Sequence, residues 1–538
     1  MSNSENSSRR SFIKGSVVFG SVLASGLASP AIAQVTAFMQ GIAESTAKDR
    51  AISAFYQSNG FSAIWTGPNG RDRARRQALL KALESAANHG LPQASYDTEF
   101  LKANLRRVKS ERDLGRIEFQ LSKLFLQYAR DIQTGILTPS RVDSDIVRQI
   151  PLRDRLELLT NFSKSSPAAY IKKLAPTAPE YTRLMKLKFT MERLLAKGGW
   201  GPNVPGKKLE PGQSGVNIVA LRNRLIAMGY MRRNASQIFD EKMQKAVQQF
   251  QLSHGLSPDG VVGAGTLREI NVSPERRLAS VMVAMERERW TNMPRGKRHI
   301  WVNLTDFQVS VIDNGKVTFQ TRSVVGANKK DRRSPEFSDI MEHMVINPTW
   351  NVPKSIAVKE YLPLMQADPN AAGHLRMIDQ TGADVIREEI DFSLLSEDYF
   401  PFDLKQPPSR RNALGLVKFM FPNRHNIYLH DTPAKNLFSR ESRAYSHGCI
   451  RLRDPFDFAY TLLRRQMSNP ETYFQDRLKT GRETVVPLEQ NVPVHLVYRT
   501  AFTTAKGQVH FRRDVYGRDA KIFAALQNAG VVLRSLRS

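Results

Sequence analysis

Residues 299–326 read HIWVNLTDFQVSVIDNGKVTFQTRSVVG. Apolar residues alternate with polar ones on both sides of a turn, at Ile300, Val302, Leu304, Val309, Val311, Val317 and Phe319. A period of two residues is typical of strands that bury one face. The turn itself, Asp313-Asn314-Gly315, carries the Asn-Gly pair that tight hairpins prefer. We therefore predict an antiparallel, β-rich domain that begins at residue 299.

The composition of the whole chain places this domain in a larger protein. The chain has 538 residues, of which 41% are hydrophobic and 24% are charged. At roughly 150 residues per domain, this length corresponds to three or four domains. The composition is that of globular proteins, and it excludes a disordered chain, a collagen and a protein with many membrane spans. We expect an α+β multidomain protein.

The region upstream of the strands has a helical pattern. Apolar residues recur at helical spacing and predict a helix with one buried face: Ile117, Leu121, Leu124, Phe125 and Tyr128. The string HGLP at residues 89–92 is typical of a helix end, and GGWGP at 198–202 is typical of a linker. We predict a helical scaffold domain over residues 34–200.

A second helical unit is predicted for residues 209–271. Its apolar faces comprise Ile218, Leu221, Leu225 and Met228 in one helix and Met243, Val247 and Phe250 in the next. The periodicity of the apolar residues alone predicts a three-helix bundle, and a bundle that binds no ligand is the alternative. The strings LRNRL at 221–225, AVQQFQ at 246–251 and HGL at 254–256 resemble the peptidoglycan-binding domain of cell-wall enzymes.

The N-terminus contains a predicted export signal. Residues 8–14, SRRSFIK, resemble the twin-arginine export signal, and a weakly apolar stretch and an A-x-A site at residues 31–33 follow. We predict a signal peptide over residues 1–33 and a periplasmic location; a disordered basic tail is the alternative. No later run of 18 apolar residues occurs, so we expect no integral membrane segment after signal removal.

The net charge limits the classes of molecule that we expect this protein to bind. Lys and Arg number 79 and Asp and Glu number 51, which gives a formal net charge of +28. Such a charge favours a polyanion: nucleic acid, an anionic membrane or an acidic wall polymer. Because an exported protein meets little nucleic acid, we expect no nucleic-acid partner and favour the wall polymer.

Downstream of the first hairpin, the catalytic domain is predicted to extend over residues 299–500 with an insertion. Residues 355–412 combine a helical run with prolines at 401, 407 and 408, a pattern that favours a capping subdomain at 355–412. Strand-like runs at 417–419 and 427–430 then return to the β domain. Residues 501–538 are predicted as a C-terminal tail.

The chain has one cysteine, Cys449, in the string SHGCIR at residues 446–451. One cysteine excludes an intramolecular disulfide and a multi-cysteine metal site. An inert buried thiol, an intermolecular disulfide and a nucleophile remain as interpretations. The nucleophile is favoured because cationic neighbours such as Arg451 lower the pKa of a thiol. A nucleophilic cysteine also needs a base, and His430 follows an apolar strand run upstream.

Longer sequence segments around His430 and Cys449 resemble those of a known family. YLHDTP at 428–433 and RAYSHGCIRL at 443–452 closely resemble the catalytic signature of L,D-transpeptidases. NPTWNVPKSI at 347–356 and NALG at 412–415 agree with this resemblance. FY at 55–56 and LAP at 174–176 are similar to the N-terminal region of the large Gram-negative members.

The resemblance implies a role for each site residue. Cys449 would be the nucleophile, His430 the general base and His447 a residue that shapes the site. Substrate contacts would come from Arg451, Ser446, Gly448, Trp350 and Tyr428. For Arg451 a structural ion pair is the open alternative to binding a substrate carboxylate. Because this family commonly orients its base through a main-chain carbonyl, we assign Asp431 no triad role.

The same resemblance implies the reaction. Cys449 would attack the L-centre carbonyl of a diamino acid in a tetrapeptide stem and release D-alanine. The side-chain amine of a second stem would resolve the thioester and form a 3→3 cross-link. No cofactor and no metal are implied, and the expected partners are peptidoglycan stem peptides and other cell-wall synthesis proteins.

Three alternatives and two departures stay open at this point. The alternatives are a same-site L,D-carboxypeptidase or endopeptidase, attachment of an envelope protein to the wall, and a non-catalytic wall-binding scaffold. The chain has Ser334-Pro335 where relatives often have Thr-Pro, and Ser409 where many have glycine.

Overall fold

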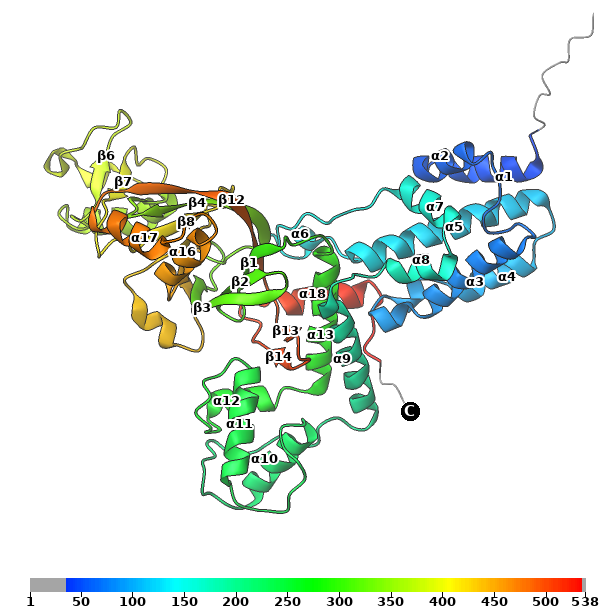
Figure 1. Ribbon diagram of the computed structural model, residues 1–538, viewed down its shortest axis with the longest axis horizontal. Coiled ribbons are helices and arrows are strands. Elements are labelled where there is room, and N and C mark those ends of the chain that lie inside the picture. Colours follow the sequence, from blue (N-terminus) through cyan, green and yellow to red (C-terminus); the bar gives the residue numbers. More distant parts are fainter. Residues whose placement is uncertain (1–34, 535–538) are drawn as a thin grey trace, which may run out of the picture.

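The computed structural model describes residues 35–534, in which three arms meet at one long helix (Figure 1). The predicted signal peptide over residues 1–33 lies outside the described residues. The joining helix is α13 (Pro274–Trp290), and every residue from Val281 to Trp290 is buried. No helix within 35–534 combines the length and apolarity needed to cross a bilayer. The predicted α+β multidomain fold is confirmed.

The first arm is a helical bundle. Its helices are α1 (Ala37–Thr46), α2 (Arg50–Ser58), α3 (Gly70–Glu84), α4 (Thr98–Arg106), α5 (Glu111–Thr134), α6 (Pro139–Val142), α7 (Arg155–Lys164), α8 (Pro167–Lys173) and α9 (Pro179–Ala196). Side chains such as Asp49 and Ser110 accept backbone N–H groups at helix starts, which fixes where those helices begin. The predicted stripe on α5 is buried at Ile117, Leu121 and Phe125.

The second arm consists of α10 (Val216–Ala227), α11 (Glu241–Ser253) and α12 (Ala264–Ile270). Its predicted apolar faces form one hydrophobic cluster. The arm packs against the rest of the protein: the ring of His254 stacks on Phe511, with centroids 5.7 Å apart. Arg512 also donates to the carbonyl oxygen of Ser253 at 3.0 Å. These contacts fix the arm to the C-terminal segment of the chain.

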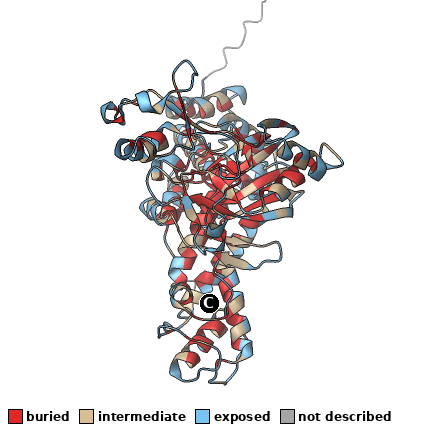
Figure 2. Cartoon of the chain, turned by 90° about the vertical axis from the view of Figure 1, so that its left-hand side faces the viewer, coloured by how far each residue is buried: buried red, intermediate tan, exposed pale blue. Residues whose placement is uncertain are grey.

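The third arm is built on a nine-stranded sheet with the order β10-β3-β11-β9-β8-β4-β12-β1-β2. The strands are β1 (Arg298–Asn303), β2 (Gln308–Asp313), β3 (Lys316–Gly326), β4 (Phe337–Ile346), β8 (Val417–Met420), β9 (Leu429–His430), β10 (Ala444–Ser446), β11 (Ile450–Leu452) and β12 (Thr484–Val497). Because β2 also pairs with β3, the sheet closes on itself, and β10 extends it beyond β3. Buried residues gather in this sheet (Figure 2).

The strand directions correct one prediction. The hairpin of β2 and β3 is antiparallel as predicted, and Asn314 and Gly315 adopt the positive φ angles of 49° and 78° that its turn requires. However, β1 pairs with β12, β9 with β11 and β3 with β10 in parallel. The sheet is therefore mixed, because local alternation predicts a strand but not its distant partner.

The insertion has its own small core. It contains β5 (Trp350–Asn351), α14 (Lys354–Ile356), the π-helical turn η3 (Ala357–Tyr361), α15 (Leu362–Ala367), β6 (Arg376–Ile378) and β7 (Asp403–Gln406). Its apolar residues form a cluster that is separate from the core of the large sheet. Outside the insertion, α16 (Pro455–Leu463) and α17 (Pro470–Lys479) contribute to that larger core.

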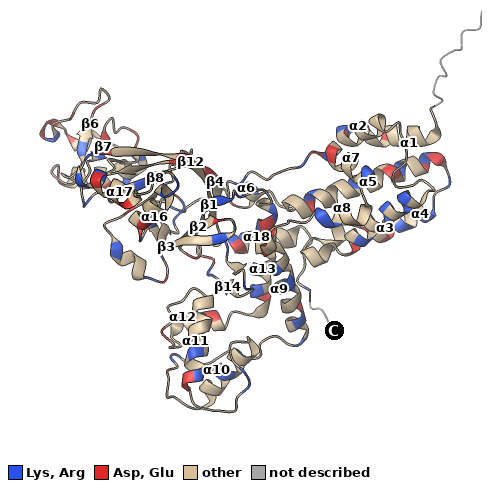
Figure 3. Ribbon diagram, in the orientation of Figure 1, with Lys and Arg blue, Asp and Glu red and all other residues tan. Residues whose placement is uncertain are grey.

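Residues 501–534 are more than a tail. They form β13 (Ala501–Thr503), β14 (Val509–Phe511) and α18 (Arg518–Asn528). Ile522 and Leu526 of α18 are buried in a cluster with α13. Arg287 of α13 pairs with Asp519 at 3.2 Å and also contacts Glu336, at the start of β4. Lys and Arg are spread over all three arms, so the net charge is not confined to one of them (Figure 3).

Candidate active site

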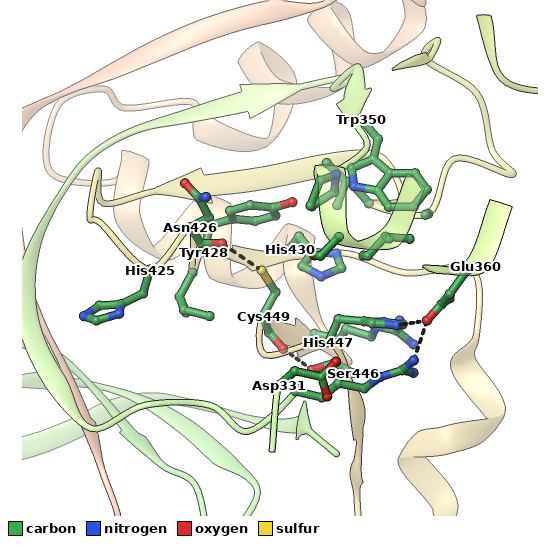
Figure 4. A pocket seen from close by; sticks show the side chains of 18 of the residues that line it. Asp331, Trp350, Glu360, His425, Asn426, Tyr428, His430, Ser446, His447 and Cys449 are labelled. Atoms are coloured by element: carbon green, nitrogen blue, oxygen red, sulfur yellow. Dashed lines mark hydrogen bonds and ion pairs between the residues drawn. The ribbon is translucent and has the colours of Figure 1, made fainter. Parts of the chain in front are cut away.

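Two short parallel strands place the predicted catalytic residues. Register in β9 and β11 pairs Leu429 with Ile450 and His430 with Arg451. Leu429 and Ile450 are fully buried in the sheet core. Because side chains alternate along a strand, their neighbours project to the other face. Tyr428, His430, Cys449 and Arg451 therefore share one face and line one cavity (Figure 4).

That cavity has a volume of about 400 Å³ and brings most of the predicted residues together. Its walls come from the loop after β3, the insertion, residues 413–414, residues 425–430 and the cysteine turn. The predicted residues among them are Trp350, Tyr428, His430, Ser446, His447, Cys449 and Arg451. Gly448 lies buried within the turn and is not part of the wall.

His430 is held as a neutral base. Its ring is 4% exposed, and Nδ1 donates to the main-chain carbonyl of Asp431. In a neutral ring with Nδ1 protonated, the lone pair is on Nε2, which can accept a proton. Burial, then the nearby Arg451, lowers the pKa of His430 to about 3. The orienting group is thus a carbonyl, while the carboxylate of Asp431 accepts from the backbone N–H of Leu416 at 3.0 Å.

The pKa of the Cys449 thiol is shifted in the direction opposite to the one predicted from the sequence. Burial raises the pKa of its thiol to about 11, although Tyr428 and Arg451 act to lower it. The expectation from cationic neighbours was wrong because loss of solvent outweighs one guanidinium at this position. Sγ donates to the carbonyl oxygen of Asn426 at 3.4 Å. The resting site therefore contains a thiol beside a neutral imidazole.

The turn that carries Cys449 is fixed by two serines. The hydroxyl of Ser446 donates to the carbonyl of Cys449 at 2.6 Å and accepts from the amide of Gly448 at 3.1 Å. Ser334, which is fully buried, donates to the carbonyl of Gly448 at 2.6 Å. Gly448 has a φ of +118°, which disfavours other residues. Ser446 thus acts inside the turn, where its hydroxyl is already bonded.

The sequence pattern did not reveal how the insertion closes the cavity. Glu360 of η3 accepts from Nε2 of His447 at 2.6 Å and from Arg332 at 2.5 Å. Lys359 of the same turn lies 3.8 Å from Asp331. These contacts join the insertion to the cysteine turn and to the loop after β3 (Figure 4). The segment KKDRR at residues 329–333 therefore contributes two residues to the site wall, Asp331 and Arg332.

Arg451 and Trp350 complete the wall. Among residues 35–534, Arg451 forms no salt bridge with an acidic side chain, and its Nε is buried without a hydrogen bond. Such a guanidinium beside a cavity suits a carboxylate ligand better than a structural ion pair. The ring of Trp350 is 8% exposed and packs edge-on against Tyr361 at 6.4 Å. In the described part of the chain, no group of three His, Cys, Asp or Glu residues could hold a metal ion.

Comparisons with known proteins agree with this geometry. Residues 297–484 match the family described as "L,D-transpeptidase catalytic domain", residues 214–270 the "Putative peptidoglycan binding domain" and residues 50–187 the "Scaffold domain". A curated protein of Haemophilus influenzae named "Putative L,D-transpeptidase" is 32% identical over 257 residues. The match covers 47% of this chain and 51% of that protein, so the chain spans about half of the relative's length. The resemblance seen in the sequence is thus confirmed at the level of its domains.

Solved structures are more distant. L,D-transpeptidases from Xylanimonas cellulosilytica and Stackebrandtia nassauensis are each 14% identical, with TM-scores of 0.17 and 0.22. Each comparison covers 55% of this chain, and 100% and 97% of the respective structures. At these scores the likeness supports no argument about the site.

Proposed function

We propose that this chain, which carries an L,D-transpeptidase catalytic domain, is a cysteine-dependent acyltransferase that forms 3→3 cross-links in peptidoglycan. One observation carries the proposal: His430 at the end of β9 and Cys449, directly before the paired strand β11, line the same cavity. His430 is oriented by the carbonyl of Asp431, so its other nitrogen can accept a proton.

In the first half-reaction, Sγ of Cys449 attacks the L-centre carbonyl of a tetrapeptide stem. Its proton passes to Nε2 of His430 as the S–C bond forms, since the resting thiol is not ionised at neutral pH. His430 then protonates the leaving nitrogen, the C–N bond breaks and D-alanine departs. Ser446 and Ser334 hold the turn through the carbonyls of Cys449 and Gly448, and in this proposal a backbone amide of that turn stabilises the developing oxyanion.

In the second half-reaction, the neutral side-chain amine of another stem attacks the thioester carbonyl. His430 accepts the proton that the amine loses, the C–S bond breaks and the sulfur recovers a proton from His430. Arg451 binds a carboxylate of the donor stem, and Trp350 and Tyr428 provide apolar contacts beside the reacting carbon. His447, held by Glu360, shapes the wall on the side of the insertion.

Product analysis tests this proposal against its main rival. Purified protein is incubated with tetrapeptide-bearing wall fragments, and the products are separated by chromatography and mass spectrometry. Cross-linked dimers that are absent with Cys449→Ala support a transferase. Free tripeptide without dimers would indicate a hydrolase that uses the same two residues.

The wall-binding arm and the export signal extend the proposal to the whole chain. We propose that α10–α12 bind peptidoglycan and that residues 1–33 direct twin-arginine export to the periplasm. Arg9→Lys combined with Arg10→Lys is expected to leave precursor in the cytoplasm, as seen by fractionation. Normal export of this double variant would contradict the twin-arginine route.

A further inference from the structure

A second cavity lies beside the catalytic one. Its volume is about 660 Å³, and its walls come from α6 and the segment after it, from Met293 after α13 and from the sheet domain. His425 lines both this cavity and the catalytic cavity, so the two adjoin. Figure 4 shows His425 and Glu360 on opposite sides of Cys449 in this view. We call the second cavity the scaffold groove; besides His425, Ser140 and Ser338, its polar wall residues are Arg148, Gln149, Asp339, Asn423 and Arg424.

The wall that the first arm contributes is firmly attached. The amide of Val147 donates to the carbonyl of Glu336 at 2.9 Å, and the amide of Glu336 donates to the carbonyl of Asp145 at 2.8 Å. Arg148 donates to the hydroxyl of Ser338 at 3.0 Å and to the carbonyl of Leu496. The groove is therefore a fixed feature between two domains, which is where ligand sites commonly occur.

An enzyme that cross-links two peptide stems must bind both of them close to the same cysteine sulfur. On the insertion side, the contacts of Glu360 with His447 and Arg332 close the cavity around the first stem. On the other side, Sγ of Cys449 faces the carbonyl of Asn426, which follows His425 directly. Only His425 is common to the walls of both cavities, so the side-chain amine of a stem bound in the scaffold groove would enter the catalytic cavity beside His425, on the side away from the insertion.

The charges of the groove match such an acceptor. Arg148 and Arg424 are cations, and Arg424 is exposed; Asp339 is the acidic side chain of the wall. A peptide stem with free carboxylates and one side-chain ammonium has the complementary pattern. We propose that the scaffold groove binds the acceptor stem, with its carboxylates on the two arginines. This inference rests on the proposed transpeptidase function and assigns the acceptor site to the scaffold and catalytic domains together.

Charge reversal at the exposed arginine tests the groove. Arg424→Glu is compared with Arg464→Glu, an exposed arginine outside both cavities, and with Gln149→Trp, which fills the groove. The substrates are a tetrapeptide stem as donor and a tripeptide stem as acceptor. D-alanine release without acceptor, and dimer formation at increasing acceptor concentration, are measured for each protein.

Arg424→Glu and Gln149→Trp are expected to raise the acceptor KM at least tenfold and to shift products from dimer to free tripeptide. Arg464→Glu should match the wild type in both assays. An unchanged acceptor KM in both groove variants would overturn the groove assignment while leaving the proposed function intact. Failure of the wild type to release D-alanine would instead overturn the proposed function, and this inference would fall with it.

Discussion

The two sides of the catalytic cavity are built by different means. On one side, main-chain pairing of β9 with β11 and buried neighbours position Cys449 and His430. On the other side, the partly exposed side chains of Glu360, Arg332 and His447 connect the insertion to the cysteine turn and to the loop after β3. Backbone pairing and burial are insensitive to salt, whereas exposed ion pairs are weak and screened. The residues that we propose for the chemistry thus lie on the rigid side, and the contacts of the insertion lie on the adjustable side.

The largest expected effect comes from the rigid side itself. Cys449→Ala removes the nucleophile, and it should abolish D-alanine release from a tetrapeptide stem. His430→Gln removes the base, and a loss of about 10² to 10⁴ in kcat is expected. Asp431→Asn keeps the carbonyl that orients His430 and serves as the control for main-chain orientation. A loss with Asp431→Asn as large as that with His430→Gln would mean that the carboxylate belongs to the catalytic machinery.

The pH dependence of the reactivity of the Cys449 thiol, on the same side of the cavity, tests whether burial raises its pKa. Alkylation requires the thiolate, and the folded-state pKa of Cys449 lies near 11 rather than near an ordinary thiol pKa of about 8.5. The charged form is disfavoured, so the iodoacetamide rate should still rise between pH 8 and 10. At pH 7 it should be about 300-fold below that of an unfolded control, because the two pKa values differ by about 2.5. A plateau below pH 8 would show that the resting pair is already a thiolate and an imidazolium.

A smaller effect is expected when the support of the turn is weakened. Ser334→Ala leaves the carbonyl of Gly448 and the amide of Gly326 without the hydroxyl that each now contacts. An unsatisfied buried polar group costs about 1–3 kcal/mol. We expect about a tenfold loss in kcat with little change in KM, and recovery in Ser334→Thr, which keeps the hydroxyl. A loss of similar size in both variants would point to packing rather than to the hydrogen bonds.

The smallest effect is expected on the closure side. Glu360→Gln keeps the size of the side chain and removes the charge that faces Arg332. Because exposed pairs contribute about 1 kcal/mol or less, donor kcat/KM should fall only a few-fold. High salt should bring the wild type towards the variant, whereas Asp384→Asn, which breaks an exposed pair elsewhere in the insertion, should change nothing. A fiftyfold loss with Glu360→Gln would give Glu360 a part in the chemistry.

The same contrast explains what could be predicted from sequence. Strand alternation and the Asn-Gly turn identified β2 and β3, and the strings around His430 and Cys449 predicted the two residues that we propose as the catalytic pair, which line one cavity. Those residues lie in short continuous strings, where local spacing carries information. The parallel pairing of β9 with β11 was missed, because pairing between distant strands leaves no local signal.

Residues that act from a distance were missed for the same reason. Glu360 reaches His447 across 87 positions of the chain, and Ser334 reaches Gly448 across 114. Asn426, whose carbonyl faces Sγ, acts through its backbone, which its residue type does not reveal. For α18 a signal existed in the helical spacing of Ile522 and Leu526, and the tail assignment overlooked it. Burial reversed the pKa expected for Cys449 because sequence neighbours do not report solvent exposure.

The most direct test is the mass of the intact protein after it is mixed with a tetrapeptide stem and quenched in acid. We predict an increase equal to the stem minus D-alanine, located on the peptide that contains Cys449 and removed by hydroxylamine, as expected of a thioester. An unmodified protein that nevertheless produces cross-linked dimers, or an adduct on any other residue, would contradict the assignment of Cys449 as the acyl carrier.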